Sequence, residues 1–303
     1  MDSPDLYDDE EYAMSDSIDN AIIMHRDAHF GGSFDVMIDY YEKEGKGVCP
    51  EFELSRIREL ALTEAKTNNN IAGILLSGPE AERVKKAKDA YKSLRDLYDK
   101  PLKSKNFLRL IADLILSEEE DPKNEIDAIV AEKGLIVPFL IDVLRSDDYH
   151  STLFPGYGCA PVLAARCLGL IGDKRAMISL FEAIGESDFF DEDDLLLALK
   201  SIGEPAKKFL LKVLHARPLN FDNERAAIAL VSFSDDPEVT EACFQMLLNK
   251  DVWKDVQLTT HLILACEGLK DEELRKKFTD LSEDPAFPKL LLQDIKLITK
   301  TWK

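Results

Sequence analysis

The chain has 303 residues, of which 45% are hydrophobic, so it can bury a sizeable core in one large or two modest domains. Its 58 Asp and Glu outnumber its 38 Lys and Arg, and the net charge of −20 repels a phosphate backbone, which excludes a nonspecific nucleic-acid binder. We therefore expect a protein partner with a basic or neutral surface, no nucleic acid and no cofactor.

The sequence shows no signal for export or for membrane insertion. The first stretch, MDSPDLYDDEEYAMSDS, contains acids but no Lys or Arg, so it lacks the positive and apolar regions of a secretory signal. The most apolar runs, such as LIVPFLIDVL, reach about ten residues, whereas a membrane helix needs about 18. The five cysteines include no C-x-x-C pair, which is typical of reduced thiols. We expect a cytoplasmic protein with no membrane span.

The chain begins with an acidic segment and two predicted helices. Residues 1–16 have few large apolar side chains and predict a disordered tail. Ser17 can cap a first helix that ends at Phe30, where Gly31 can close it in the left-handed conformation. Ser33 can cap a second helix, FDVMIDYYEKE.

Two further helices complete a predicted N-terminal helical bundle over residues 17–103. The third, EFELSRIRELALTEA, starts after Pro50, and the fourth runs from Pro79 to Pro101. Apolar side chains in the fourth helix recur three and four residues apart: Val84, Ala87, Tyr91, Leu94 and Tyr98. This stripe can be a coiled-coil seam for a partner, but it spans only about two heptads, so we expect it to pack within the chain.

Two histidines in the first helix, His25 and His29, have the spacing of the H-E-x-x-H zinc helix. The residue in place of its glutamate is Arg26. A cation cannot take a proton from metal-bound water and disfavours a divalent ion nearby, which excludes the metalloprotease interpretation.

His25 and His29 follow the apolar stripe of Ile18 and Ile22, so we expect them to be half-buried and hydrogen-bonded to carboxylates of the second helix. A metal site is an alternative that needs at least a third ligand, and a pH-sensitive contact is another. The carboxylates available are Asp35, Asp39 and Glu42.

An insertion over residues 145–161, RSDDYHSTLFPGYGCAP, follows a helix, a turn at Gly134 and a second helix. Aromatic side chains on a loop shaped by Gly and Pro favour a recognition site, because they offer a large contact area at low entropy cost. The residues in question are Tyr149, His150, Phe154 and Tyr157. In the alternative, Phe154 and Tyr157 plug the core between helical hairpins.

Three segments of the second half align without gaps, starting at Leu163, Asp194 and Glu224. Their matched leucines, Leu168, Leu199 and Leu230, are 31 residues apart. Each segment predicts a short helix, a tight turn and a second amphipathic helix, a hairpin that can bury its apolar face only against stacked neighbours. Leu264 follows Leu230 by 34 residues and predicts one more unit with three inserted residues. FPKLLLQDIKLITKTWK then predicts a terminal cap, and the array is expected over 104–303.

The stretch VLAARCLGLIGDKRAMISLFEAI, residues 162–184, resembles the HEAT-like repeat first described in phycobilisome (PBS) lyases. The match includes the Ala-Ala pair and the Leu-Gly-x-Ile-Gly-Asp turn. This resemblance implies an all-α fold, an armadillo-like HEAT α-solenoid (α-α superhelix) that follows the N-terminal helical bundle.

The same resemblance implies several possible activities, since such repeats occur in bilin lyases, in an iron-dependent hydroxylase and in proteins that only bind proteins. The hydroxylases carry His-Glu dipeptides, and none of the five histidines here precedes Glu. The sequence also lacks the nucleophile-elbow, Walker and dinucleotide-binding motifs.

We therefore expect a non-enzymatic scaffold or adaptor for protein–protein interaction. The alternative is an enzyme or enzyme subunit, either metal-dependent through His25 and His29 or a bilin-lyase-like tetrapyrrole handler. Lysines expected to be exposed on one second helix extend the predicted partner-binding set, which is Tyr149, His150, Phe154, Tyr157, Lys207, Lys208 and Lys212.

Overall fold

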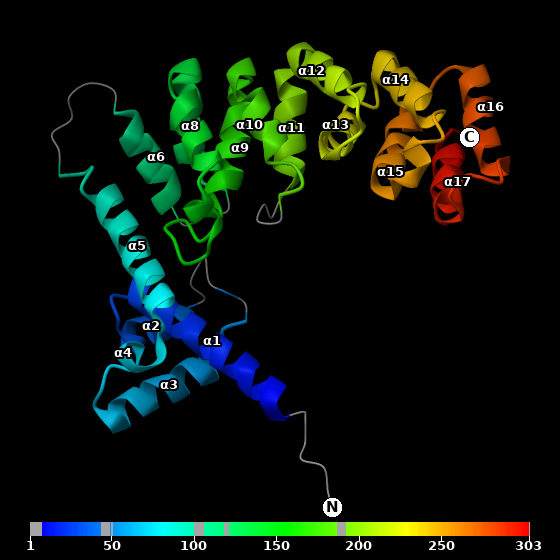
Figure 1. Ribbon diagram of the computed structural model, residues 1–303. Helices are drawn as coiled ribbons and strands as arrows, with labels where there is room; N and C mark the ends of the chain where they lie inside the picture. Colours follow the sequence, from blue (N-terminus) through cyan, green and yellow to red (C-terminus); the bar gives the residue numbers. More distant parts are fainter. Residues whose placement is uncertain are drawn as a thin grey trace, which may run out of the picture. The chain divides into compact units, whose positions relative to one another are not determined.

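The computed structural model describes residues 8–43, 49, 51–99, 106–117, 121–186 and 192–302. Every regular element in these ranges is a helix, which confirms the all-α expectation (Figure 1). Two compact units form: residues 1–132 with 145–163, and residues 133–144 with 164–303. These differ from the predicted division after residue 103, because residues 104–132, expected in the array, belong to the first unit, and residues of the 145–161 insertion pack with the N-terminal helices.

The first unit contains seven α-helices among the described residues. They are α1 (Asp8–His29), α2 (Phe34–Glu42), α3 (Leu54–Thr67), α4 (Ala72–Leu75), α5 (Gly78–Arg95), α6 (Phe107–Leu116) and α7 (Lys123–Ala131). The backbone of α1 starts nine residues before the predicted Ser17, in part of the segment expected to be disordered. Acidic residues at a helix start favour this extension, since they oppose the helix dipole. Residues 1–7 of the predicted tail lie outside the described residues.

Local capping in the first unit follows the predicted pattern. Gly31 and Gly32 adopt positive φ angles of 62° and 80°, which lets the chain turn after α1. The Ser33 hydroxyl accepts a hydrogen bond from the Val36 amide at 3.3 Å and caps α2. The predicted third helix begins at Leu54, where Glu53 occupies the cap position without a capping hydrogen bond from its side chain.

The fourth predicted helix, α5, packs within its own unit as expected. Four of its five stripe residues are buried, while Tyr98 lies beyond the end of the helix and is partly exposed. The Ser77 amide and Glu80 carboxylate form a capping box at its start, which places Pro79 in the first turn. Contacts of α5 and α4 with α1, and of α2 with α3, build the core of the unit.

Among the residues that the structure describes, the second unit contains ten α-helices. The first turn of one of them, α9, is assigned to the first unit, because residues 160–163 belong there. These helices are α8 (Val137–Leu144), α9 (Ala160–Ile171), α10 (Met177–Glu182), α11 (Glu192–Ile202), α12 (Glu204–Leu214), α13 (Phe221–Val231), α14 (Pro237–Leu247), α15 (Val256–Ala265), α16 (Glu272–Asp280) and α17 (Leu292–Thr301). Short 3-10 turns flank them at Lys133–Leu135, Lys174–Ala176, Val252–Lys254, Cys266–Gly268, Leu281–Glu283 and Lys289–Leu291, and one in the first unit spans Asp147–His150.

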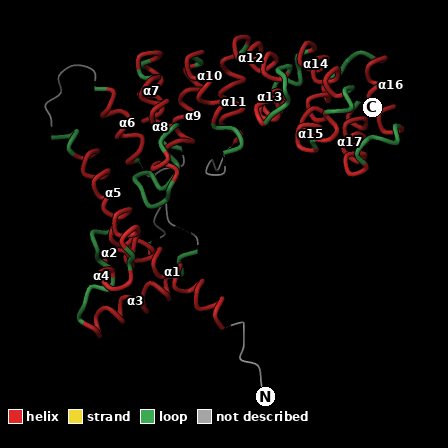
Figure 2. Tube along the Cα trace, in the orientation of Figure 1, coloured by secondary structure: helices red, strands yellow, loops and turns green. Residues whose placement is uncertain are grey.

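Helices of the second unit alternate between two layers, which Figure 1 shows most clearly from α12 to α17, and the Cα trace of Figure 2 follows the same path. We call α9, α11, α13, α15 and α17 the first helices, and α10, α12, α14 and α16 the second helices. Helix α11 packs on α10 and α12, and the first helices α13, α15 and α17 each pack on the second helix that precedes them. Helix α15 also packs on the first helices α13 and α17. A continuous apolar core results.

The predicted 31-residue register is confirmed by burial, because Leu168, Leu199 and Leu230 are all fully buried. The predicted register of the next unit is wrong. Leu264 is 37% exposed, whereas Cys266, which follows Leu230 by 36 residues, is fully buried in the equivalent place. The extra turn Val252–Lys254 lengthens the connection before α15, and residue spacing alone could not reveal it.

First helices approach one another closely at glycine. A Cβ atom on Gly169 of α9 would lie 2.8 Å from Cα of Ala198 in α11, a backbone atom that cannot rotate away. A Cβ on Gly268 would lie 1.6 Å from the carbonyl oxygen of Ser234. Glycine is therefore required at both contacts, and the helices would have to separate to admit a larger residue.

Replacing Gly169 with Ala should lower the free energy of unfolding by about 2 kcal/mol, since overpacking a tight contact costs about 1–3 kcal/mol. Urea titration followed by circular dichroism measures this. Gly73→Ala is the matched control, because a Cβ on Gly73 meets no atom within 4 Å. Equal stability of the two variants would contradict the close contact of α9 and α11.

Candidate functional site

The exposed surface of the first helices carries a row of large apolar side chains at equivalent positions. Leu197, Ile228 and Leu264 are separated by 31 and 36 residues, the spacings that also relate the buried positions of α11, α13 and α15. Leu297 of α17 follows Leu264 by 33 residues, just as the buried Ile295 follows the buried Leu262. We call Leu197, Ile228, Leu264 and Leu297 the apolar row.

The row is open to solvent in the described structure. Leu197, Leu264 and Leu297 are 61%, 37% and 51% exposed, and Ile228 is half-buried. In α9 the equivalent position is Arg166, whose guanidinium pairs with Asp194 at 3.0 Å, so the row begins at α11. Large apolar side chains that recur at one register across packed helices mark an interaction surface more strongly than scattered ones do.

Carboxylates border the row at the start of the first helices. Glu224 lies one helical turn before Ile228, and burial together with the nearby Asp255 carboxylate raises the pKa of Glu224 above its ordinary value. Within the described residues, neither Glu224 nor Asp255 forms an ion pair. His261 lies within electrostatic range of Asp255, but burial lowers the pKa of His261, so it carries little positive charge at neutral pH.

A second set of equivalent residues holds the start of three first helices, α11, α13 and α15, in place. The side chains of Glu192, Asn223 and Thr259 each bond the end of the preceding helix or turn, again at spacings of 31 and 36 residues. Glu192 accepts from the Gly185 amide at 2.8 Å, Asn223 donates to the Leu214 carbonyl at 2.9 Å, and Thr259 donates to the Val252 carbonyl at 2.9 Å. Because the three residues are a glutamate, an asparagine and a threonine, a comparison of the repeats by residue identity does not detect their equivalence.

The lysines predicted to bind a partner lie on α12, and one of them is not exposed. Lys207 is only 7% exposed, because its ammonium group lies 2.8–2.9 Å from the carboxylates of Glu204, Asp236 and Glu238. It therefore joins α12 to the start of α14, which corrects the expectation that it is a surface lysine. Lys208 is exposed and pairs with Glu204 at 3.3 Å, and Lys212 is exposed.

Of the two histidines of α1, His25 is buried and His29 is half-buried in the first unit. Nε2 of His29 lies 3.1 Å from the Thr152 carbonyl oxygen, which can only accept, so this nitrogen carries the proton. Nδ1 of His29 must then accept from the Tyr91 hydroxyl at 2.7 Å. Nε2 of His25 lies 3.5 Å from the Thr152 hydroxyl and 3.7 Å from Sγ of Cys49.

The partners of these histidines are not the predicted carboxylates. Asp35 and Asp39 are both exposed on α2, and Asp39 pairs with Lys43 at 2.7 Å. Both ring nitrogens of His29 already have hydrogen-bond partners. In the ranges that the structure describes, no group of three or more His, Cys, Asp and Glu side chains is placed to hold a metal ion. The geometry thus supplies hydrogen-bond partners and no third ligand.

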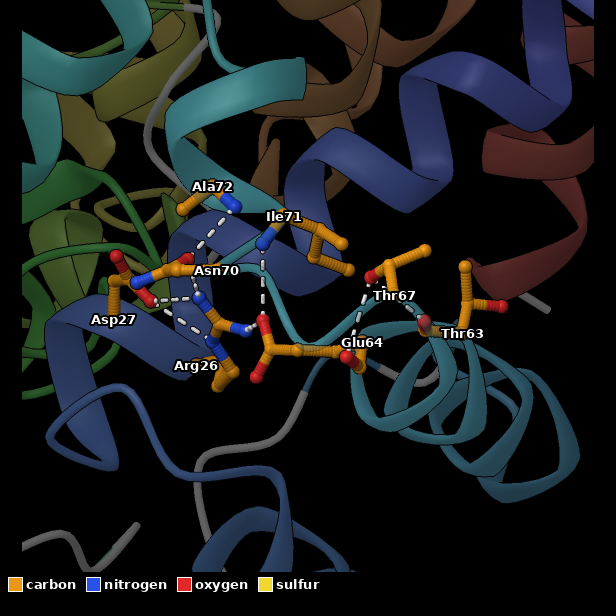
Figure 3. A network of polar contacts seen from close by, with 8 residues as sticks. All are labelled: Arg26, Asp27, Thr63, Glu64, Thr67, Asn70, Ile71 and Ala72. Carbon is orange, nitrogen blue, oxygen red and sulfur yellow. Dashed lines mark hydrogen bonds and ion pairs between the residues drawn. The ribbon is translucent and has the colours of Figure 1, made fainter.

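Arg26, the residue that replaces the zinc-helix glutamate, is fully buried and structural (Figure 3). Its guanidinium donates to Asp27, to Glu64 at 2.6 Å and to Asn70 at 3.1 Å. The Glu64 carboxylate also accepts from the Ile71 amide at 3.0 Å, which fixes the connection between α3 and α4.

The aromatic residues of the 145–161 insertion divide into two groups. Phe154 and Tyr157 are buried, Phe154 in the cluster formed by α1 and α5, and Tyr157 with its ring 4.6 Å from that of His29. They are buried, as in the alternative expectation, but in the core of the first unit and not between helical hairpins, and they offer no surface to a partner in this conformation. Tyr149 and His150 are only half-buried. Their binding role stays a prediction.

Replacing Lys207 with Ala should lower the midpoint of thermal unfolding, because three carboxylates would be left close together without their cation. Lys208→Ala is the control, since this lysine is exposed and its single pair contributes little. Differential scanning calorimetry compares the two variants. A Lys208 effect as large as the Lys207 effect would show that α12 and α14 are not joined in this way.

Acidification should destabilise the first unit. Burial lowers the pKa of His25 to about 3, with contributions from His29 and Arg83, and burial lowers that of His29 to about 4. Because the unfolded histidines titrate near 6.5, the unfolded chain binds more protons below that pH, and stability is lost as the pH falls from 6.5 towards 4. The loss is up to about 1.4 kcal/mol per histidine and pH unit.

The measurement is the unfolding midpoint in urea at a series of pH values for the native chain and for a His25→Gln, His29→Gln variant. The variant should show a flatter dependence between pH 6.5 and 4, whatever its stability at pH 7. Identical slopes would contradict the assignment of this dependence to the two histidines.

No described helix has the length and apolar character to cross a membrane. No protein-family model matches the sequence, and no curated protein matches it significantly. Any role of the apolar row, or of His25 and His29, is therefore inferred from the residues of this chain alone.

Proposed function

We propose that the chain is a non-enzymatic scaffold that binds another protein through the apolar row. In this proposal the second unit is a HEAT-like α-solenoid of the type first described in PBS lyases, and the protein works in the cytoplasm. The 31-residue register of buried leucines and the two alternating layers of helices support the solenoid assignment.

The observation that carries the proposal is that Leu197, Leu264 and Leu297 are exposed, and Ile228 half-buried, at one register of four first helices. The repeat obliges each first helix to bury one face, but it places no such demand on the opposite face. Polar residues there would keep the unit apart from other proteins, whereas large apolar residues at that register favour association. The acidic border adds selectivity for a partner of opposite charge.

The test is an affinity capture from extract of the native host, read by mass spectrometry. The baits are the native chain, a Leu197→Glu, Leu264→Glu variant, and an Ile178→Glu, Leu248→Glu control. The control positions are also exposed, at 50% and 41%, but they lie on α10 and at the end of α14 in the other layer.

We expect a protein that the native chain and the control both retain and that the row variant loses. Circular dichroism must show the same helix content and unfolding midpoint for both variants. Equal retention by all three baits, or loss from the control alone, would contradict the proposal.

A further inference from the structure

The apolar row has dimensions that constrain the segment able to cover it. Helix α15 packs on both α13 and α17, and Lys200 of α11 donates to the Ser232 carbonyl at the end of α13 at 2.6 Å. Since packed helices lie about 8–10 Å apart, we take about that distance between successive row residues. A helix lying across the four first helices advances about 10.5 Å in seven residues. One apolar residue per heptad of such a helix would therefore meet one residue of the row.

An extended segment fits this spacing less well. A strand covers about 10 Å in three residues, and side chains three apart along a strand point to opposite faces. Only every second one of these side chains would then face the row. Covering three steps between four helices takes about 24–30 Å, or roughly 16–20 residues of helix.

The carboxylates beside the row favour a partner with positive charge. Glu224 and Asp255 lie close enough for the Asp255 carboxylate to raise the pKa of Glu224, and within the described residues neither has a cationic partner. Glu192 adds a third carboxylate at the start of α11, within electrostatic range of His261. Lys200, on α11, is occupied by the Ser232 carbonyl and by Asp235, both at 2.6 Å. A Lys or Arg from a partner would relieve the repulsion between Glu224 and Asp255.

We propose that the row binds a basic amphipathic α-helix of a partner protein, with apolar residues at heptad spacing and Lys or Arg along the edge that faces Glu224 and Asp255. This inference rests on the proposed function and names the class of its partner. Other occupants are disfavoured by charge. A second copy carries the same net charge of −20, and the chain's first 17 residues contain no Lys or Arg.

The test uses the full-length protein and three fluorescent peptides of about three heptads. The first has one Leu per heptad on one face and Lys on the flanks, the second has the same composition with scrambled order, and the third replaces Lys by Glu. We expect saturable binding of the first peptide in fluorescence anisotropy, at least about tenfold tighter than either of the others. Binding should weaken as salt is added.

Two variants locate the peptide. One variant combines Leu197→Glu with Leu264→Glu, and the other combines Glu224→Gln with Asp255→Asn. Each should weaken binding about tenfold, and the second variant should also reduce the dependence of binding on salt. Asn keeps the helix-capping ability of Asp255. The Ile178→Glu, Leu248→Glu control should bind as the native chain does.

Several results would overturn the inference. They are equal affinity for the ordered and scrambled peptides, unchanged affinity of the Glu224→Gln, Asp255→Asn variant, and a dimer in light scattering that the row variant abolishes. The two proposals can fail separately. If the ordered peptide does not bind, but affinity capture still finds a partner that the row variant loses, the proposed scaffold function is supported and the proposed helical partner is wrong. If both fail, the row is not a binding surface.

Discussion

The constraint on which the second unit depends is that no single helical hairpin can bury its own apolar face. Leu168, Leu199 and Leu230, at the same position of successive first helices, are all fully buried. This requirement fixes the rotation of each first helix about its axis, and the close approach at Gly169 tightens it. Once the rotation is fixed, the side chains that face solvent are fixed as well, and among them Leu197 and Ile228 lie at one register. The candidate binding surface is thus a consequence of how the core is built.

The first unit is held by a different kind of interaction, namely polar groups taken out of water and satisfied by distant parts of the chain. Arg26 has no exposed surface and bonds residues on either side of the turn between α3 and α4. His29 joins the Tyr91 hydroxyl to the Thr152 carbonyl and so ties the 145–161 insertion to α1 and α5. Such groups are costly to bury unless every partner is present, so they specify one arrangement of these segments.

The sequence was informative where local rules decide the structure. Helical periodicity, the Ser33 cap and the 31-residue period could all be predicted from it. Prediction failed where distant residues decide. Leu264 looked like the next buried leucine, but the 3-10 turn at Val252–Lys254 shifts the register so that Cys266 is buried instead. Lys207 was predicted to be exposed, but it forms ion pairs with Asp236 and Glu238 of the next hairpin and is buried. The apolar row itself appears only after that register is corrected.

Site-specific photo-crosslinking in living cells can show whether a partner protein covers the surface of the first helices, as we propose. A photoreactive amino acid is placed at Leu197 in one protein and at Ile178, on the other layer, in a second. We expect a specific crosslinked product from position 197 that is absent from position 178, with a basic protein as the captured species. Crosslinks of equal yield from both positions, or from position 178 alone, would contradict it.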